Sequence, residues 1–228
     1  GARLIASGAH VTYVARGAHL SAIQSSGLRV ESPKGNLHLT DVEATDDIRS
    51  VGQADIVLMT VKMYDLESAA ATLVPLIGPD TVVVTLQNGV EAVDIVAHHV
   101  GREHVAGGVA YVAAVIAEPG LIRHTSLDAL IFGGLDGRRS DRVLALEAAC
   151  QKAGFSARVS EAIDTDLWSK FARLSVFSGM TTVTRSPIGV VRSDPDLLAL
   201  LQAACEEAAA GGRARGRQLP ESLMARNM

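Results

Sequence analysis

The chain reads Ala54-Asp-Ile-Val-Leu-Met-Thr-Val-Lys62 and, further on, Thr81-Val-Val-Val-Thr-Leu-Gln87, two almost unbroken apolar runs that decide the fold class. Runs of this length are typical of parallel β-strands that are covered on both faces. The segment between them, residues 64–77, has apolar residues at helical spacing, and we expect Pro75 to fray its last turn. Strand, helix and strand in this order predict a right-handed crossover in an α/β sheet.

Upstream, the first residues read as the end of another strand-and-helix unit. Residues 1–8 predict the last turns of a helix that glycine closes, and residues 10–16 predict a β-strand. No opening strand and no glycine-rich loop precede them, so we expect the first βαβ unit to be incomplete. Residues 27–40 alternate in polarity around Pro33-Lys-Gly-Asn36, which predicts a β-hairpin.

Downstream, the pattern changes to β-type runs separated by turn signals at residues 118–120 and 126–128. We expect antiparallel strands that extend the sheet, then an amphipathic helix and a short edge strand. The predicted antiparallel strands are residues 105–117, 120–125 and 129–133. The predicted helix is residues 139–153, before Gly154, and the predicted edge strand is residues 157–160.

Beyond Ser160 the sequence turns wholly helical, which places a domain boundary there. We therefore predict an α/β, Rossmann-type dinucleotide-binding domain in residues 1–160, truncated at its start. An all-α domain is predicted for residues 161–228, and we expect it to be truncated at its end because residues 219–228 read as the start of a further helix with Pro220 in its first turn.

The composition excludes several classes of protein. The chain has 228 residues, 48% of them hydrophobic and 20% charged, with a net charge of −4 and scattered basic residues, so neither a nucleic acid nor a membrane surface is the expected partner. No apolar run approaches the roughly 18 residues of a transmembrane helix, and no signal peptide opens the chain, which favours a cytoplasmic protein. Cys150 and Cys205 lack metal-ligand spacing, and we expect buried thiols and no metal site.

Candidate binding residues follow the predicted strands at their carboxyl ends, where open α/β sheets bind ligands. Arg16 ends one strand and precedes Gly17, which lets a ligand approach closely. An arginine here favours the extra phosphate of NADP, whereas an acidic residue would favour NAD. Lys62 holds the same position on a later strand and is a second candidate for a phosphate or ribose contact. The alternative for both side chains is a solvated charge.

Asn88 and Lys170 are the candidates for the reaction itself. Asn88-Gly89 ends a buried strand, and its amide suits a nicotinamide ribose and a substrate carbonyl, although Asn-Gly is also a common turn. Lys170 lies in the predicted helix of residues 162–171 and is the best candidate for an acid catalyst, with a solvated surface charge as the alternative. The histidines are interpreted as structural; they are His98, His99, His104 and His124.

Several of these stretches together resemble the ketopantoate reductase (2-dehydropantoate 2-reductase) family. They are residues 1–17, Val61-Lys62, Leu86-Gln-Asn-Gly89, residues 119–124 and Leu167-Trp-Ser-Lys-Phe171. The resemblance implies a Rossmann domain, a helical domain, and reduction of a 2-oxo acid by NADPH in pantothenate synthesis. It further implies site roles: Lys170 as proton donor and substrate contact, Asn88 as cofactor and substrate contact, Arg16 and Lys62 at the adenosine phosphate, and Ala113 at the cofactor.

The chain also departs from that family. Polar asparagines that the family carries in its second domain fall here on Leu174, Ser178 and Ile188, and of these only Ser178 is able to hydrogen-bond to a substrate. The expected partner is a small 2-oxo acid, with a homodimer as one option for assembly. Two alternatives stay open: a related 2-oxo-acid or 3-hydroxyacid dehydrogenase, and a non-catalytic remnant that binds cofactor or dimerises.

Overall fold

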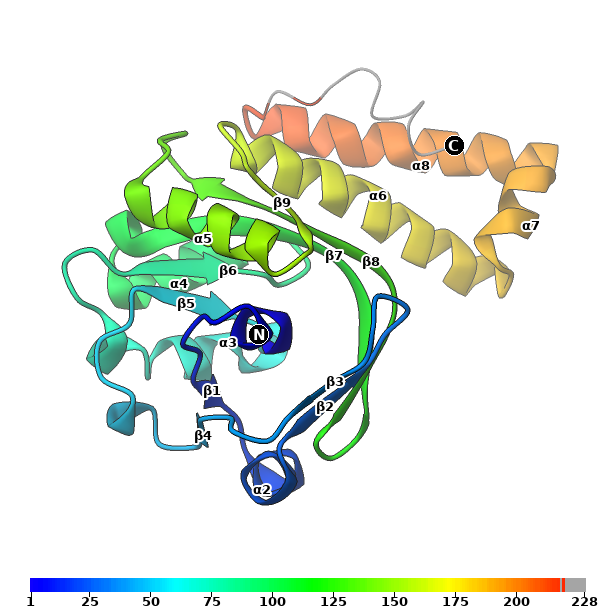
Figure 1. The fold of residues 1–228 in the computed structure, drawn as a ribbon. Helices are drawn as coiled ribbons and strands as arrows, with labels where there is room; N and C mark the ends of the chain where they lie inside the picture. The colour runs from blue at the N-terminus through cyan, green and yellow to red at the C-terminus, as the bar shows by residue number, and fades with distance from the viewer. Residues whose placement is uncertain (218, 220–228) are drawn as a thin grey trace.

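The computed structural model describes residues 1–217 and residue 219 of the chain. A sheet flanked by helices forms the N-terminal part, and three helices form a separate layer beside it (Figure 1). The elements are α1 (Ala2–Ala6), β1 (Tyr13–Val14), α2 (Gly17–Ser26), β2 (Leu28–Glu31), β3 (Leu37–Leu39), β4 (Ala44–Thr45), β5 (Ile56–Met59), α3 (Met63–Ala70), β6 (Val82–Thr85), α4 (Ala92–Val100), β7 (Val105–Glu118), β8 (Leu121–Gly134), α5 (Asp141–Lys152), β9 (Ser156–Val159), α6 (Ile163–Thr184), α7 (Ile188–Ser193) and α8 (Pro195–Ala214).

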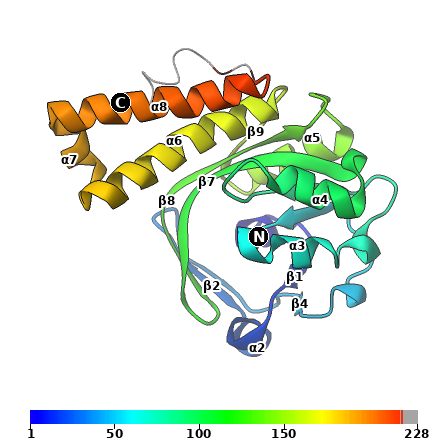
Figure 2. The ribbon, with the colours of Figure 1, turned by 180° about the vertical axis from the view of Figure 1, so that it is seen from behind.

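The main sheet has seven strands in the order β3-β2-β8-β7-β6-β5, with β9 paired to β8. Strands β5 and β6 are parallel, as the apolar runs predicted. The antiparallel pairing expected downstream is present between β7 and β8, but β7 pairs with β6 in the parallel sense. The hairpin of β2 and β3 and the edge strand β9 are also confirmed. In both views the long β7–β8 ribbon curves away from the helix-covered part of the sheet (Figures 1 and 2).

Alternate residues of the central strands face two different cores, which is why the strands are apolar throughout. Val83 of β6 packs with α3 and α4 on one face, while Val84 packs with α1 and α5 on the other, and each is at most 1% exposed. Phe132 of β8 is fully buried in the second of these cores. Such two-sided burial is the arrangement expected of a parallel sheet.

Two predicted elements are longer than the elements that the structure has. The helix expected to reach residue 77 ends at Ala70, and Pro75 lies in a separate short 3-10 helix, Val74–Leu76. Proline disfavours the helical conformation of the residue before it, so an α-helix ends upstream of it. The strand expected over residues 10–16 is only Tyr13–Val14, which pairs with β4 in a small two-stranded sheet of its own. Only these two residues find β partners, because β4 is equally short.

The turn expected at residues 126–128 is instead an irregularity inside one continuous strand, β8. Its register against β7 shifts on both sides of Ala113, and Leu127 has a positive φ of 59°. The ring of His124 lies 2.7 Å from the Leu127 carbonyl oxygen and 3.2 Å from that of Ser126. The Ser-Leu-Asp signal therefore marks a β-bulge, which bends a strand without ending it.

The helical layer has a small core of its own around Met180 of α6, Val191 of α7 and Leu201 of α8. Cys205 is buried there, and Cys150 lies on the buried face of α5, so both thiols are free and buried as predicted. None of the described helices is long and apolar enough to cross a membrane. The helix predicted for residues 219–228 lies outside the described residues except for Leu219, which packs against Trp168. The domain boundary near Ser160 stays a prediction.

Candidate active site

A close contact between α6 and β7 sets the position of Lys170. A Cβ atom on Gly107 of β7 would lie 2.9 Å from Ile163 and 3.0 Å from Leu167, so glycine lets the helix approach the strand closely. Ala110 lies three residues after Gly107, which is about 10 Å along the strand. Lys170 lies seven residues after Ile163, which is also about 10 Å along the helix. The two elements therefore stay in step as far as Lys170, whose Nζ donates a hydrogen bond of 2.7 Å to the Ala110 carbonyl oxygen.

The surroundings of Lys170 change its acidity. Its side chain is partly buried, and its Nζ lies 5.5 Å from the ring centre of Tyr111. Burial lowers the pKa of the Lys170 ammonium below its usual 10.5, and the nearby positive charge of Arg173 lowers it further. A lysine with a lowered pKa gives up its proton more readily near neutral pH, which suits a general acid. A fully solvated surface charge would not have these surroundings.

The cofactor candidates lie at the start of two helices. Arg16 immediately precedes α2 and Lys62 immediately precedes α3. The guanidinium of Arg16 donates a 3.1 Å hydrogen bond to Asp65, in the first turn of α3, so Arg16 is drawn toward the helix that Lys62 begins. The Arg16 side chain is 79% exposed, and Gly17 has open space where a Cβ would lie. Helix N-termini and exposed cations are suited to a phosphate group.

Gln87 is a site residue that the sequence reasoning missed. It is 7% exposed, and its Nε2 donates to the carbonyl oxygens of Met59 and Val61, at 3.0 Å each. These bonds tie the carboxyl end of β6 to that of β5, so they position Asn88 and Lys62 on neighbouring strands. The Gln87 Oε1 is buried and has no partner among the residues described. The available signal was a glutamine within an otherwise apolar run, which implies a specific hydrogen bond.

The remaining predicted site residues lie further apart. Asn88 is exposed directly after β6. Ala113 lies at the β-bulge, three residues beyond Ala110, and its carbonyl oxygen accepts a hydrogen bond from Thr125 at 3.2 Å. Ser178 is exposed on α6, about 12 Å along the helix axis from Lys170. Roles for Asn88, Ala113 and Ser178 in binding therefore stay predictions.

Leu174 and Ile188, the apolar residues at positions where the family carries asparagines, have different surroundings. Leu174, one turn after Lys170, is 38% exposed on α6. Ile188 begins α7 and packs against the core of the helical layer. Neither side chain is able to hydrogen-bond to a substrate.

Three of the four histidines have hydrogen-bond partners that explain them structurally, and the ring of His98 contacts that of His99 edge-on. His99, at the end of α4, pairs with Glu67 at 2.8 Å, and His104 lies 3.0 Å from the Thr81 carbonyl oxygen. His124 lies 2.9 Å from the Ser32 hydroxyl. Within residues 1–217 and 219, no group of three His, Cys, Asp or Glu side chains is arranged to hold a metal ion.

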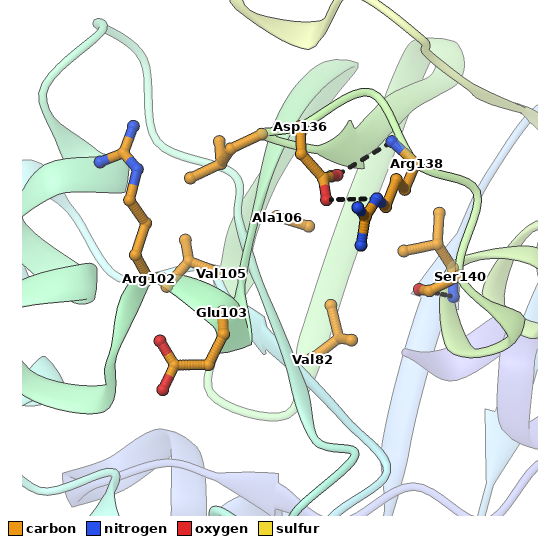
Figure 3. A pocket seen from close by; sticks show the side chains of 11 residues that line it. Val82, Arg102, Glu103, Val105, Ala106, Asp136, Arg138 and Ser140 are labelled. Atoms are coloured by element: carbon orange, nitrogen blue, oxygen red, sulfur yellow. Dashed lines mark hydrogen bonds and ion pairs between the residues drawn. The ribbon is translucent and has the colours of Figure 1, made fainter.

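A hollow of about 510 Å³ lies elsewhere, where β6 and β7 begin (Figure 3). Both arginines of its lining are already paired, Arg138 with Asp136 at 3.3 Å and Arg102 with Asp94 at 2.8 Å. Ligands of parallel sheets bind at the opposite edge, where strands end. This hollow is therefore not the candidate active site.

Comparisons with known proteins identify the family. The family model described as ketopantoate reductase PanE/ApbA matches residues 1–137, and the model of the C-terminal part of the same family matches residues 162–228. The chain belongs to the ketopantoate reductase family. A curated relative, the 2-dehydropantoate 2-reductase of Mesorhizobium japonicum, is 33% identical over 95% of this chain and 72% of its own length. The resemblance inferred from the sequence is thereby confirmed.

Solved structures of the same family have the same fold. A putative ketopantoate reductase from Ralstonia solanacearum is 34% identical with a TM-score of 0.88, covering 100% of this chain and 77% of that one. The 2-dehydropantoate 2-reductase from Porphyromonas gingivalis is 29% identical with a TM-score of 0.91, covering 99% and 81%. They confirm a Rossmann-like N-terminal domain followed by a helical domain. The first three curated relatives are longer than the chain, which spans 63–72% of their lengths.

Proposed function

We propose that this chain carries out the NADPH-dependent reduction of a 2-oxo acid, ketopantoate, to the 2-hydroxy acid pantoate in the synthesis of pantothenate and coenzyme A. The observation that carries the proposal is the partly buried ammonium of Lys170, held by the Ala110 carbonyl oxygen in a chain of the ketopantoate reductase family. Relatives named 2-dehydropantoate 2-reductase support this substrate.

In the proposed reaction the nicotinamide cofactor supplies hydride to the C2 carbonyl carbon. Lys170 donates a proton to the carbonyl oxygen as negative charge develops on it, and its ammonium stabilises that charge. The hydrogen bond to Ala110 uses one of the three ammonium N–H groups, so two are left for the substrate. The Ala110 carbonyl oxygen fixes the position of the Lys170 Nζ beside β7, so the ammonium proton that is donated has a defined position.

The residues present fit a nicotinamide dinucleotide that carries an adenosine phosphate. Arg16 and Lys62 would hold the phosphate, because their positive charges lie at the beginnings of α2 and α3. Gly17 and Gly89 have positive φ values of 61° and 109° and open space where a Cβ would lie, so a ligand is able to approach their backbone. Asn88 would then contact the ribose next to the nicotinamide.

The proposed function is tested by following NADPH absorbance with purified full-length protein and ketopantoate. We expect oxidation that depends on ketopantoate and is faster with NADPH than with NADH. Turnover of another 2-oxo acid or a 3-hydroxy acid in preference to ketopantoate would favour a related dehydrogenase. If the protein binds cofactor but turns over none of these acids, the non-catalytic alternative holds.

Replacing Arg16 with alanine should erode the preference for NADPH. One charge-assisted hydrogen bond to a phosphate is worth about 1.5–3 kcal/mol, so kcat/KM for NADPH should fall about 10- to 150-fold while that for NADH changes little. Asp65→Asn is the matched control, because it frees Arg16 from its ion pair and should keep or increase the preference. An unchanged NADPH-to-NADH ratio in Arg16→Ala would contradict the assignment.

The pH dependence of kcat/KM, which reports on the free enzyme, should reveal the pKa of Lys170. A general acid acts while it is protonated, so the rate is full below its pKa and is lost as the pH rises through it. Since burial and Arg173 lower the pKa of Lys170, this loss should occur below pH 10.5. The measurement is kcat/KM for ketopantoate between pH 6 and 11, and a value that stays constant up to pH 10.5 would exclude Lys170 as the acid.

Assembly and location complete the proposal. We propose that the only small molecules the protein requires are the 2-oxo acid and the cofactor, and that it works in the cytoplasm, where both are dissolved. A homodimer is the assembly that we propose to test. Size-exclusion chromatography with light scattering measures it directly, and a mass equal to one chain would exclude it.

A further inference from the structure

Lys170 has a cationic neighbour that the sequence reasoning did not single out. Arg173 lies one turn further along α6, and its guanidinium carbon is 5.3 Å from the ring centre of Tyr111. The Nζ of Lys170 lies 5.5 Å from the same ring centre. One aromatic ring of β7 therefore holds two cations from successive turns of the helix.

These two cations have no counter-ion in the part of the chain that the structure describes. None of the ion pairs among residues 1–217 and 219 involves Lys170 or Arg173. The acidic residues nearby on the same helix are already engaged, Asp164 with Arg217 and Asp166 with Arg158. Both cationic side chains are partly buried.

The repulsion between the two cations has a measurable consequence. The charge of Arg173 is the second cause, after burial, of the lowered pKa of Lys170. Like charges that are held together in partly buried positions disfavour each other, and a bound anion removes this cost. The arrangement on Tyr111 is therefore suited to a negatively charged ligand.

We propose that Arg173 is a specificity-determining residue that binds the carboxylate of the 2-oxo acid while Lys170 protonates the neighbouring carbonyl oxygen. The inference rests on the proposed function. In a 2-oxo acid the carboxylate and the carbonyl are on adjacent carbons, and helix residues three apart have Cβ atoms about 5–6 Å apart. Two neighbouring groups of one small molecule thus meet two neighbouring cations of one helix.

The chemistry of each cation matches its role. The planar guanidinium of Arg173 presents paired N–H groups that fit the two oxygens of a carboxylate. The Lys170 ammonium is able to lose its proton. Leu174, the next residue, has no group that binds a carboxylate. Arg173 would therefore select acids over esters, lactones and amides of the same carbon skeleton.

The test compares ketopantoate with ketopantoyl lactone, which has the same carbonyl but no carboxylate. We expect Arg173→Met to reduce the acid-to-lactone ratio of kcat/KM about 10- to 100-fold, mainly through a higher KM for the acid. It should also move the alkaline loss of kcat/KM to higher pH, because a positive charge beside Lys170 is removed from the free enzyme. Arg173→Lys should retain part of the preference for the acid over the lactone. Arg213→Met, on the exposed last turn of α8, should leave the ratio unchanged.

An unchanged acid-to-lactone ratio of kcat/KM in a folded Arg173→Met variant would overturn the proposal. This holds whether kcat/KM is kept for both substrates or lost equally for both. Calorimetric titration with oxamate and methyl oxamate in the presence of NADPH gives a readout without turnover. Weaker binding of oxamate alone in Arg173→Met supports a carboxylate contact, and equal binding in wild type and variant excludes it. If wild type reduces no 2-oxo acid, the proposed function fails, and the titration still decides the role of Arg173.

Discussion

Lys170→Ala should lower kcat for ketopantoate about a hundred- to ten-thousand-fold, the range over which a general acid contributes. The ammonium is needed when charge develops on the carbonyl oxygen, so its loss should affect kcat far more than the binding of NADPH. Steady-state NADPH oxidation measures the first quantity, and fluorescence titration with NADPH measures the second.

Lys152→Ala is the matched control for this experiment. Lys152 is an exposed lysine at the end of α5, and it should be replaceable with little effect on either quantity. A Lys170→Ala variant that kept ketopantoate reduction within about twofold of wild type, where general acids contribute at least about a hundredfold, would exclude the proposed mechanism. The interpretation of Lys170 as a solvated charge predicts that result.

The sequence predicted the central sheet well because its signal is local. β5 and β6 are apolar except for Thr85, and Val83 and Val84 show why, since successive residues enter two different cores. The places of Arg16 and Lys62 next to helix starts follow from the order of strands and helices alone. Such features need no knowledge of how distant segments pack.

Contacts between distant segments were not predictable in the same way. Gln87, after β6, contacts Met59 and Val61 on the neighbouring β5 segment. Arg173, in the helical layer, contacts Tyr111 of the sheet. Both contacts depend on how distant segments align in the fold, which local sequence patterns do not reveal. The bulge at Leu127 was mistaken for a turn for a related reason, because turns and bulges favour the same kind of local residues and differ only in whether pairing continues.

Gly107→Val should disturb stability and catalysis together, because this glycine sets the distance between β7 and α6. Even the Cβ of valine would lie within about 3 Å of Ile163 and Leu167, which are 2% and 7% exposed and have little room to move. Overpacking of this kind usually costs about 1–3 kcal/mol, which urea unfolding measures. If α6 is displaced by about 1 Å, Lys170 moves with it and kcat should fall about a hundredfold.

Gly211→Ala separates this close-packing effect from the general effect of replacing a glycine. Gly211 lies within α8 and has nothing within 4 Å of a Cβ, so alanine should stabilise the helix by about 0.5–1 kcal/mol and leave kcat unchanged. A Gly107→Val protein as stable and as active as wild type would mean that the close contact does not position Lys170. A variant that loses stability but keeps kcat would mean that the hydrogen bond to Ala110 positions the ammonium without help from the helix contact.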